Sequence, residues 1–253
     1  MSLLDDVQAF VQEANRVTEI EELQALLTET VHKLGFDYYA LVHHVNIYET
    51  GGKIVHLFDY PKSWIEMVDR RSYFTDDPVH MACQKSAAPF QWSNMRSIVN
   101  LSARQEEILR SAHDAGLGAG FTVPVHVPGE ATGSCSFSTR AGRDLPEAAL
   151  PAAHYVGSFA FEAARRVASR KFGAMKARDA ANPPKLTRRQ LDCVVLAGRG
   201  KSDKDVARVL GISDQTVHQH LEDAKRKYEV TTRTQLVVRA LFDSQVAFVD
   251  LFK

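Results

Sequence analysis

The residue types that could do chemistry gather between Tyr60 and Trp92, in the run YPKSWIEMVDRRSYFTDDPVHMACQKSAAPFQW. Trp64 carries an indole N–H that can only donate a hydrogen bond, and the carboxylate of Asp77 can only accept one. The hydroxyl group of Tyr60 can do both. These groups suit the binding of a ligand. They equally fit an aromatic core in which Asp77 caps the helix after Pro78, and the residues alone leave both interpretations open.

No set of residues supports catalysis. Cys135 and the serines beside it lack the G-x-S-x-G elbow of hydrolases. His43 and His44 are adjacent on a predicted strand and point to opposite faces, so they cannot chelate one metal ion together. The run GLGAG leads from a helix into a strand, which is the reverse of the order in a dinucleotide-binding loop. We therefore predict no enzyme, no metal site and no cofactor.

The length of 253 residues suggests two domains. We place the first at residues 1–172, a linker at 173–185 and the second at 186–253. The linker GAMKARDAANPPK lacks apolar periodicity and ends in Pro-Pro-Lys. From residue 185 onward the chain has 13 Lys and Arg against 9 Asp and Glu, and the remainder has 18 against 22. A basic C-terminal domain beside an acidic N-terminal one favours DNA binding at one end only.

Cysteine usage and hydropathy predict a cytoplasmic protein without membrane contact. Cys83, Cys135 and Cys193 are far apart and odd in number, so they indicate neither a disulfide framework nor a zinc site. A reducing cytoplasm is the simplest location for them. The acidic start MSLLDD does not resemble a signal peptide, and the most apolar region, 148–164, is too short to span a bilayer.

Hairpins organise the first domain, which we predict to be of the α+β class. The patterns predict helices at 3–16, 19–34 and about 146–172, strands at 37–46 and 53–58 around Gly51-Gly52, and strands at 118–126 and 132–139 around Pro128-Gly129. Consecutive hairpins imply an antiparallel sheet. A receiver domain controlled by phosphorylation would need strands that alternate strictly with helices, and this pattern is absent.

A helix-turn-helix can be read near the C-terminus. Ser202 is an N-cap candidate for a helix that ends at Gly211, and Ser213 caps the next helix, which runs to about Tyr228. The tight turn between them is a helix-turn-helix signature, whose second helix enters the DNA major groove. The candidate DNA-contacting residues are Gln215, Thr216, His218, Gln219, Lys201, Lys225 and Arg226. Gln and His can reach base edges, and Lys and Arg suit phosphates. The alternative is a plain helical hairpin with a solvated polar face.

The run GKSDKDVARVLGISDQTVHQH resembles the LuxR-type DNA-binding module. Residues that fit the family pattern are Gly200, Lys201, Ser202, Val206, Ala207, Leu210, Ile212, Ser213, Thr216, Val217 and His220. The resemblance implies an all-α, four-helix domain. One departure is Gln190, where the family usually has Glu; we expect a changed local hydrogen bond and an unchanged fold.

The run from Tyr60 to Trp92 resembles the autoinducer-binding domain of LuxR-type quorum-sensing receptors, whose pattern is roughly Y-P-x-x-W, then DPV, then a second Trp. GLGAGFTVPVHVPGEATGSCSFS resembles a further segment of that family, so the resemblance covers nearly the whole chain. It implies an α/β/α sandwich that holds an N-acyl homoserine lactone between its sheet and one helix layer.

The resemblance also implies a role for each candidate residue. Trp64 donates to the lactone carbonyl and Asp77 accepts from the amide N–H. Tyr60 and Ser136 donate to the amide carbonyl, and Trp92 packs on the lactone ring. Each polar group left unpaired in a closed pocket costs about 1–3 kcal/mol, so the set would select sharply for the head group.

Two departures from the family concern the acyl group. Val68 stands where the family usually has Tyr, which leaves space in the pocket wall. Thr132, Ser134 and Ser136 share one face of a predicted strand, so a long straight alkyl tail would meet hydroxyl groups. We predict a short, branched or aromatic acyl group. The same departures leave open a non-lactone signal, or a regulator that acts without ligand.

The expected function is a ligand-responsive transcriptional regulator of quorum sensing. It would bind double-stranded DNA as a homodimer at a near-palindromic site, with RNA polymerase as a candidate partner. We expect the signal to complete the core of the N-terminal domain, so that binding and folding are linked. The remaining alternative is an enzyme that acts on acyl lactones through Asp77 or Ser136, against which the basic helix-turn-helix argues.

Overall fold

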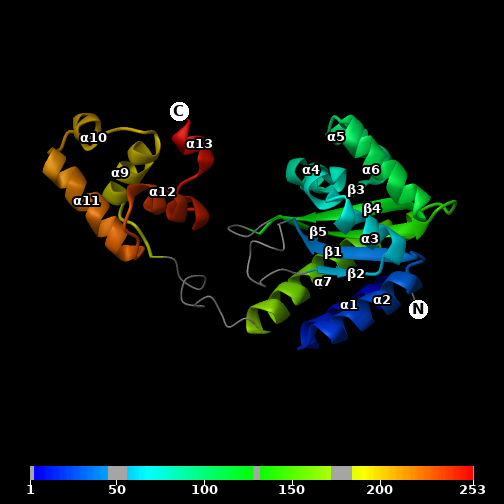
Figure 1. Ribbon diagram of the computed structural model, residues 1–253. Coiled ribbons are helices and arrows are strands. Elements are labelled where there is room, and N and C mark those ends of the chain that lie inside the picture. The colour runs from blue at the N-terminus through cyan, green and yellow to red at the C-terminus, as the bar shows by residue number, and fades with distance from the viewer. Residues whose placement is uncertain (1–2, 45–55, 128–131, 172–183, 253) are drawn as a thin grey trace. The chain divides into compact units, whose positions relative to one another are not determined.

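The computed structural model describes residues 3–44, 56–127, 132–171 and 184–252, and the chain divides into two compact units (Figure 1). The units are Met1–Met175 and Lys176–Lys253, and each has a hydrophobic core of its own. Most of the linker predicted at 173–185 lies outside the described residues, as do the expected turns at Gly51-Gly52 and Pro128-Gly129. Within the described ranges, no helix is long and apolar enough to cross a membrane.

A five-stranded antiparallel sheet lies at the centre of the N-terminal unit, with the strand order β2-β1-β5-β4-β3. The strands are β1 (Tyr38–His43), β2 (His56–Phe58), β3 (Phe90–Gln91), β4 (Leu117–Val125) and β5 (Gly133–Arg140). The last strand in sequence lies between β1 and β4. Its Ser136 therefore stands opposite Ala40 on one side and Thr122 on the other.

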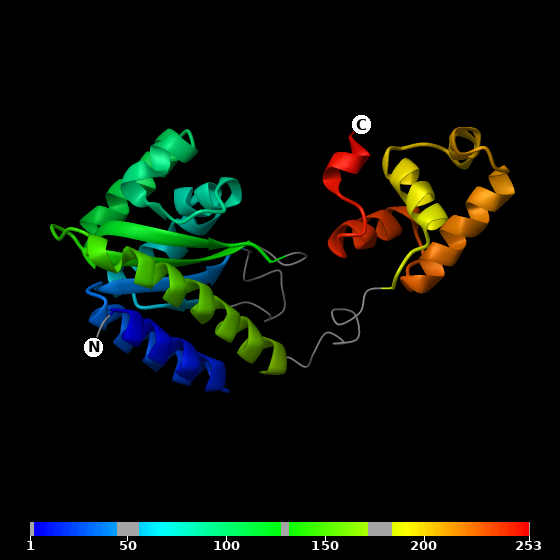
Figure 2. The same ribbon diagram turned by 180° about the vertical axis from the view of Figure 1, so that it is seen from behind.

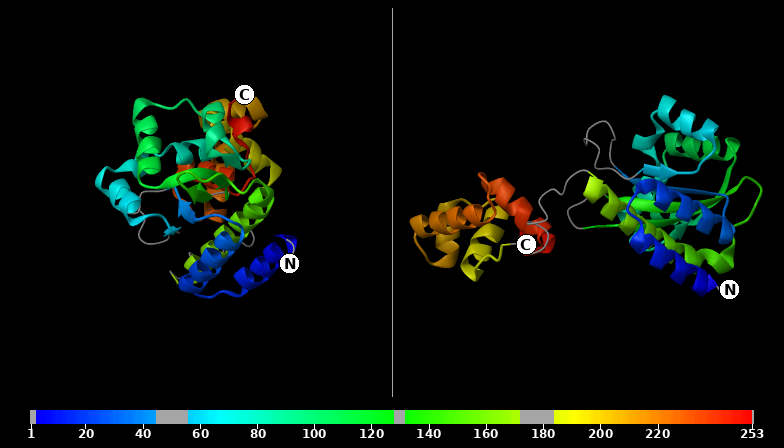
Figure 3. Two further views of the ribbon diagram at one scale, coloured as in Figure 1. Left: turned by 90° about the vertical axis from the view of Figure 1, so that its right-hand side faces the viewer. Right: turned by 90° about the horizontal axis from the view of Figure 1, so that it is seen from below.

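One face of this sheet carries the main core of the unit. It is covered by α1 (Leu3–Arg16), α2 (Ile20–Lys33) and α7 (Leu150–Lys171), which η3 (Glu147–Ala149) precedes. Figures 2 and 3 show α1 and α7 side by side along this face. Alternate strand residues, such as Leu41 and Phe137, point toward these helices and are fully buried. The three helices and the sheet thus form a dry, close-packed layer.

The other face is covered by shorter elements. They are α3 (Lys62–Arg70), η1 (Tyr73–Asp76), α4 (Pro78–Lys85), η2 (Trp92–Asn94), α5 (Met95–Ile98) and α6 (Ala103–Asp114). The helix α6 begins with the predicted capping box, in which Ser102 and Gln105 each accept a backbone N–H of the other. The hydrophobic clusters here are small and separate. The result is the predicted sandwich, with a packed layer on one side of the sheet and a looser one on the other.

The C-terminal unit is all-helical. Its helices are α9 (Arg188–Gly198), α10 (Asp203–Leu210), α11 (Asp214–Lys227), α12 (Arg233–Phe242) and α13 (Phe248–Leu251). Ser202 and Ser213 cap α10 and α11 as predicted, and Gly211 ends α10 at a φ of 65°, in the left-handed region. The short α13 goes beyond the four expected helices. It packs on α9, where a Cβ at Gly198 would lie 2.6 Å from a methyl carbon of Leu251, so that Leu251 would have to shift.

Candidate functional site

A cavity of about 650 Å³ lies between the sheet and the shorter helices of its second face. Strands β1 and β5 form one wall, and α3, η1, α4 and α6 form the other. The volume falls within the range of about 300–1,000 Å³ that is typical of small-molecule sites. Seven of the eight residues predicted to bind ligand line this cavity, namely Tyr60, Trp64, Val68, Asp77, Trp92, Ser134 and Ser136.

Thr132, the eighth predicted residue, is not among those that line the cavity. It precedes the first residue of β5, and its backbone carbonyl accepts a hydrogen bond of 2.7 Å from the N–H of His44. The alternation along β5 therefore brings Ser134 and Ser136 to the cavity, while Thr132 lies beyond the end of the strand.

A chain of hydrogen bonds crosses the sheet at the cavity wall. The indole N–H of Trp92 donates to Oγ1 of Thr122 over 2.9 Å, and that oxygen lies 2.8 Å from Oγ of Ser136. Tyr60 and Ser136 both line the cavity. Because Gly120 has no side chain, the ring of Trp92 lies directly on β4; a Cβ at that position would be 2.2 Å from the ring. Our sequence reasoning missed Thr122, although its alternation with Gly120 on β4 was readable.

Asp77 and Tyr60 both line the cavity and offer hydrogen-bonding groups to a ligand. Oδ1 of Asp77 accepts the backbone N–H of Val79 over 2.8 Å and so caps α4, while the residue also lines the cavity. The two interpretations of Asp77 are therefore compatible. Burial, with the charge of Asp77, raises the pKa of Tyr60 well above its usual value. The phenol stays neutral and keeps a proton to donate.

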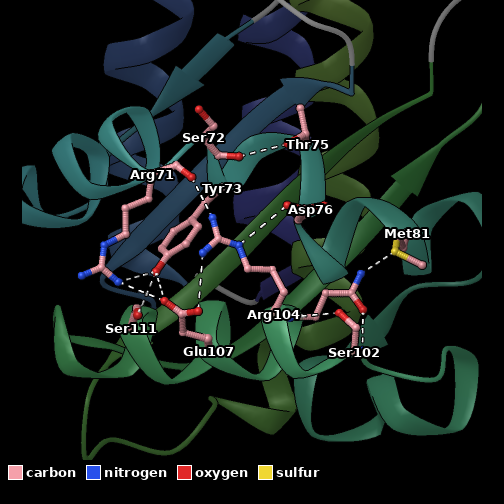
Figure 4. Close-up of polar contacts among 11 residues, drawn as sticks. Arg71, Ser72, Tyr73, Thr75, Asp76, Met81, Ser102, Arg104, Glu107 and Ser111 are labelled. Atoms are coloured by element: carbon pink, nitrogen blue, oxygen red, sulfur yellow. Dashed lines mark hydrogen bonds and ion pairs between the residues drawn. The ribbon is translucent and has the colours of Figure 1, made fainter.

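Sequence reasoning also missed a cluster around Tyr73, which joins η1 to α6 (Figure 4). Tyr73 is fully buried, and its hydroxyl group donates to Oε1 of Glu107 over 3.0 Å and accepts from Arg71 over 2.8 Å. The guanidinium of Arg104 lies 4.8 Å from the centre of the Tyr73 ring. The hydrogen bond from Tyr73 is the main reason that the pKa of Glu107 is lowered.

This Tyr73 cluster supports a wall of the cavity. The ring of Trp64 packs on that of Tyr73, with 6.0 Å between the ring centres. Arg104 donates to the backbone carbonyl of Arg71 over 2.8 Å, which ties the end of α3 to α6. Arg104 and Arg71 are 33 residues apart in sequence, so no local pattern predicts their contact.

Histidines gather at the part of the cavity beside β1 and β2. His56 and His80 line it, and His44 stacks on His80 with 4.0 Å between the ring centres. Nε2 of His44 is 2.9 Å from Oγ of Ser134. Burial, assisted by the neighbouring histidines, lowers the pKa of His44 to about 2, and burial also lowers the pKa of His56. Of the histidines in the first domain, only His43 and His44 were considered in the sequence, and only as a possible metal pair, so this cluster was not predicted. In the described part of the chain, no group of three or more His, Cys, Asp or Glu is arranged to hold a metal ion.

In the C-terminal unit, α11 exposes the residues predicted to read bases. Gln215, Thr216, His218 and Gln219 are exposed, whereas Val217, Leu221 and Ala224 of the same helix are buried. The hydroxyl group of Thr216 is 2.8 Å from that of Ser213, so it takes part in the N-cap. The exposed polar stripe starts at the first turn of the helix.

The predicted phosphate-contacting residues are already paired in part. Lys225 forms an ion pair with Glu222, and Arg226 forms one with Asp223. Lys201 is exposed before α10. The Arg226 side chain is 73% exposed, and exposed ion pairs contribute about 0–1 kcal/mol, so exchange of Asp223 for a DNA phosphate would cost little. Lys225 is only 18% exposed.

The residue Gln190, where the sequence departs from the family pattern, closes a capping box at the start of α9. Its Oε1 accepts the backbone N–H of Thr187 over 2.9 Å and also accepts Nζ of Lys227 over 2.9 Å. An amide oxygen can therefore do here what a carboxylate would do, and the fold is unchanged.

Comparisons with known proteins match both units. The model of the family described as "Autoinducer binding domain" matches residues 19–164, and that of "Bacterial regulatory proteins, luxR family" matches residues 184–240. The transcriptional activator protein AhyR of Aeromonas hydrophila is 25% identical over 240 residues, which cover 94% of this chain and 90% of AhyR.

Two solved structures have a similar fold. The crystal structure of Escherichia coli SdiA matches with a TM-score of 0.59 at 20% identity, and the match covers 97% of this chain and 100% of that one. SdiA in complex with octanoyl-rac-glycerol matches with a TM-score of 0.58 at 20% identity and covers 96% of each chain.

Proposed function

The chain belongs to the LuxR family of autoinducer-binding transcriptional regulators, and on that premise we propose that its cavity binds an N-acyl homoserine lactone. The observation that carries the proposal is the convergence of seven predicted residues on one cavity of suitable volume. In this proposal Trp64 donates to the lactone carbonyl, and Asp77 accepts from the amide N–H. The amide carbonyl accepts from Tyr60 and Ser136, and Trp92 packs on the lactone ring.

A short, branched or aromatic acyl group is part of the same proposal. Val68 lines the cavity, where a smaller side chain leaves room for a bulky group. Ser134 and Ser136 bring hydroxyl groups to the opposite wall, which is unfavourable for a long alkyl chain.

We further propose that the protein binds a near-palindromic DNA site as a dimer in the cytoplasm. Exposed apolar side chains support a self-interface in each unit: Leu4, Tyr155 and Phe159 on α1 and α7, and Val238 and Phe242 on α12. Large apolar side chains that group on a surface often mark contacts between subunits. Two copies of α11 related by a two-fold axis would then contact successive major grooves.

The ligand proposal is tested by thermal denaturation with N-acyl homoserine lactones that vary in length, branching and aromaticity. A ligand at about 100 times its dissociation constant should add about 2.7 kcal/mol to the free energy of unfolding. Trp64→Phe keeps the ring and removes the donor, so it should abolish most of this gain. His113→Asn, at an exposed position of α6, is the matched control and should keep the gain. A flat response across the panel would contradict lactone binding.

The DNA proposal is tested by footprinting. Alanine at Gln215, His218 and Gln219 should abolish site choice, while Gln24→Ala on α2 should leave it unchanged. If the triple variant still selected the same site, α11 would not be the reading helix.

A second candidate is a regulator of the same family that responds to a non-lactone signal. It is favoured by the polar, histidine-rich part of the cavity, and a related fold, SdiA, has been solved with octanoyl-rac-glycerol, a ligand that is not a lactone. Stabilisation by acylglycerols but by no lactone would select this candidate.

A further inference from the structure

The side chains around the cavity wall differ between two positions on β5, Ser136 and Ser134. Ser136 is joined through hydrogen bonds to Thr122 and, through it, to Trp92, in the region assigned to the lactone head group. Ser134 is two residues away on the same face of the strand, which corresponds to about 7 Å. A ligand held by its head group near Ser136 therefore extends its acyl chain past Ser134.

The side chains around Ser134 are polar where an acyl chain would favour apolar ones. His56 and His80 line the cavity here. His44, which is not among the lining residues, forms a hydrogen bond with Ser134. Nε2 of His56 lies 3.2 Å from the backbone carbonyl oxygen of His43. A carbonyl oxygen only accepts, so Nε2 of this neutral ring carries the proton and Nδ1 is left as an acceptor.

Two of the histidines in this region, His44 and His56, contribute no positive charge. Burial lowers the pKa of His44 and of His56, so both rings are neutral near pH 7. Among the described residues, those that line the cavity include the carboxylates Glu66, Asp69 and Asp77 and neither Lys nor Arg. An anionic group on the acyl chain would meet repulsion from these carboxylates. A neutral group that can donate a hydrogen bond fits the acceptor at His56.

Aromatic rings define the shape of the same region. Phe74 packs edge-on against His80, with 4.6 Å between ring centres, and lies 5.6 Å from the ring of His56. Phe58 lines the cavity two residues further along β2, level with Ala40 and Ser136. A ring or a compact chain can pack between such side chains while its end reaches the histidines.

We propose that His56, His80 and Ser134 form a subsite that binds a hydroxyl group at the far end of the acyl chain. The subsite rests on the proposed lactone function and narrows it to acyl groups that end in a hydroxyl. The hydroxyl donates to Nδ1 of His56 and accepts from Ser134 or His80, whereas a plain alkyl or phenyl end offers Nδ1 of His56 no donor.

The test uses matched pairs of ligands with the same head group. One pair is N-hexanoyl and N-(6-hydroxyhexanoyl) homoserine lactone, and the other is the N-(3-phenylpropanoyl) lactone and its para-hydroxy analogue. Dissociation constants are measured by calorimetry on the full chain. In at least one pair the hydroxylated member should bind about tenfold more tightly, because one net hydrogen bond contributes that much.

Substitutions of His56 and His80 then test whether the preference for the hydroxylated ligand arises at these residues. His56→Phe and His80→Phe keep a ring for Phe74 to pack on, and each should reduce the ratio within the pair toward one. The ratio is taken within one variant, so a general loss of stability or affinity cancels. His113→Phe, a histidine exposed on α6, should keep the ratio of the unsubstituted protein.

The outcomes separate this inference from the proposed function. Equal affinities within both pairs would overturn the hydroxyl subsite while lactone binding stands. A tenfold preference that survives both histidine substitutions would overturn the assignment to these residues. If no member of either pair bound, lactone binding itself would be contradicted, and the subsite with it.

Discussion

Substitution of Gly120 by Ala should disturb the cavity through a single clash. The added Cβ would lie 2.2–2.5 Å from three atoms of the Trp92 ring, well inside ordinary van der Waals contact. The ring must move away from β4 and lose its 2.9 Å hydrogen bond to Thr122. Overpacking costs about 1–3 kcal/mol and a lost hydrogen bond about 1 kcal/mol. We expect Gly120→Ala to lower the free energy of unfolding by about 2–4 kcal/mol.

A double-mutant cycle tests this reasoning. If the clash with the ring is the cause, Gly120→Ala should cost less than about 0.5 kcal/mol when Trp92 is already Ala. Urea unfolding followed by tryptophan fluorescence is a suitable assay, because Trp64 and Trp92 are the two tryptophans of the chain and both lie in the N-terminal unit. Trp64 still reports when Trp92 is replaced. Additive effects of the two substitutions would refute the argument.

Three further predictions concern the same unit. Tyr73→Phe should lower the free energy of unfolding by about 1 kcal/mol in urea titrations, because it removes the hydroxyl that joins Arg71 to Glu107. Asp77→Ala should cost about 0.5–2 kcal/mol through the lost N-cap, whereas Asp77→Asn should retain the cap and lose mainly lactone affinity in calorimetry. The pKa of His44 is about 2 in the folded chain, so below about pH 6.5 the unfolded chain binds a proton that the folded chain does not. Stability should therefore fall as the pH drops from about 6.5, by at most about 1.4 kcal/mol per pH unit, and urea midpoints for His44→Asn should show a weaker pH dependence.

The DNA-binding unit shows how much of a fold local sequence can predict. Ser202, Gly211 and Ser213 mark the helix ends, and each acts on backbone groups within a few residues. The predicted all-helical class and the LuxR-type family are confirmed. The helix α13 went unpredicted because its place depends on Leu251 packing against Gly198, about fifty residues earlier.

The N-terminal unit shows what local sequence patterns do not predict. Hairpin patterns predicted an antiparallel sheet, and this class is confirmed. The placement of β5 between β1 and β4 decides which side chains meet, since it brings Ser134 next to His44 and Ser136 next to Thr122. Pairing between distant strands has no signature in either strand alone.

The sequence by itself determined the two-unit class, the helix ends, the exposed stripe of α11 and the residue types available to a ligand. These properties depend on periodicity and on capping, which act over a few residues. Only the tertiary structure determines the cavity and its volume, the Tyr73 cluster and the position of Trp92 on Gly120. It also determines the neutral state of the buried His44 near Ser134. Each of these depends on contacts between segments tens of residues apart, and on burial that shifts a pKa only after those segments have packed together.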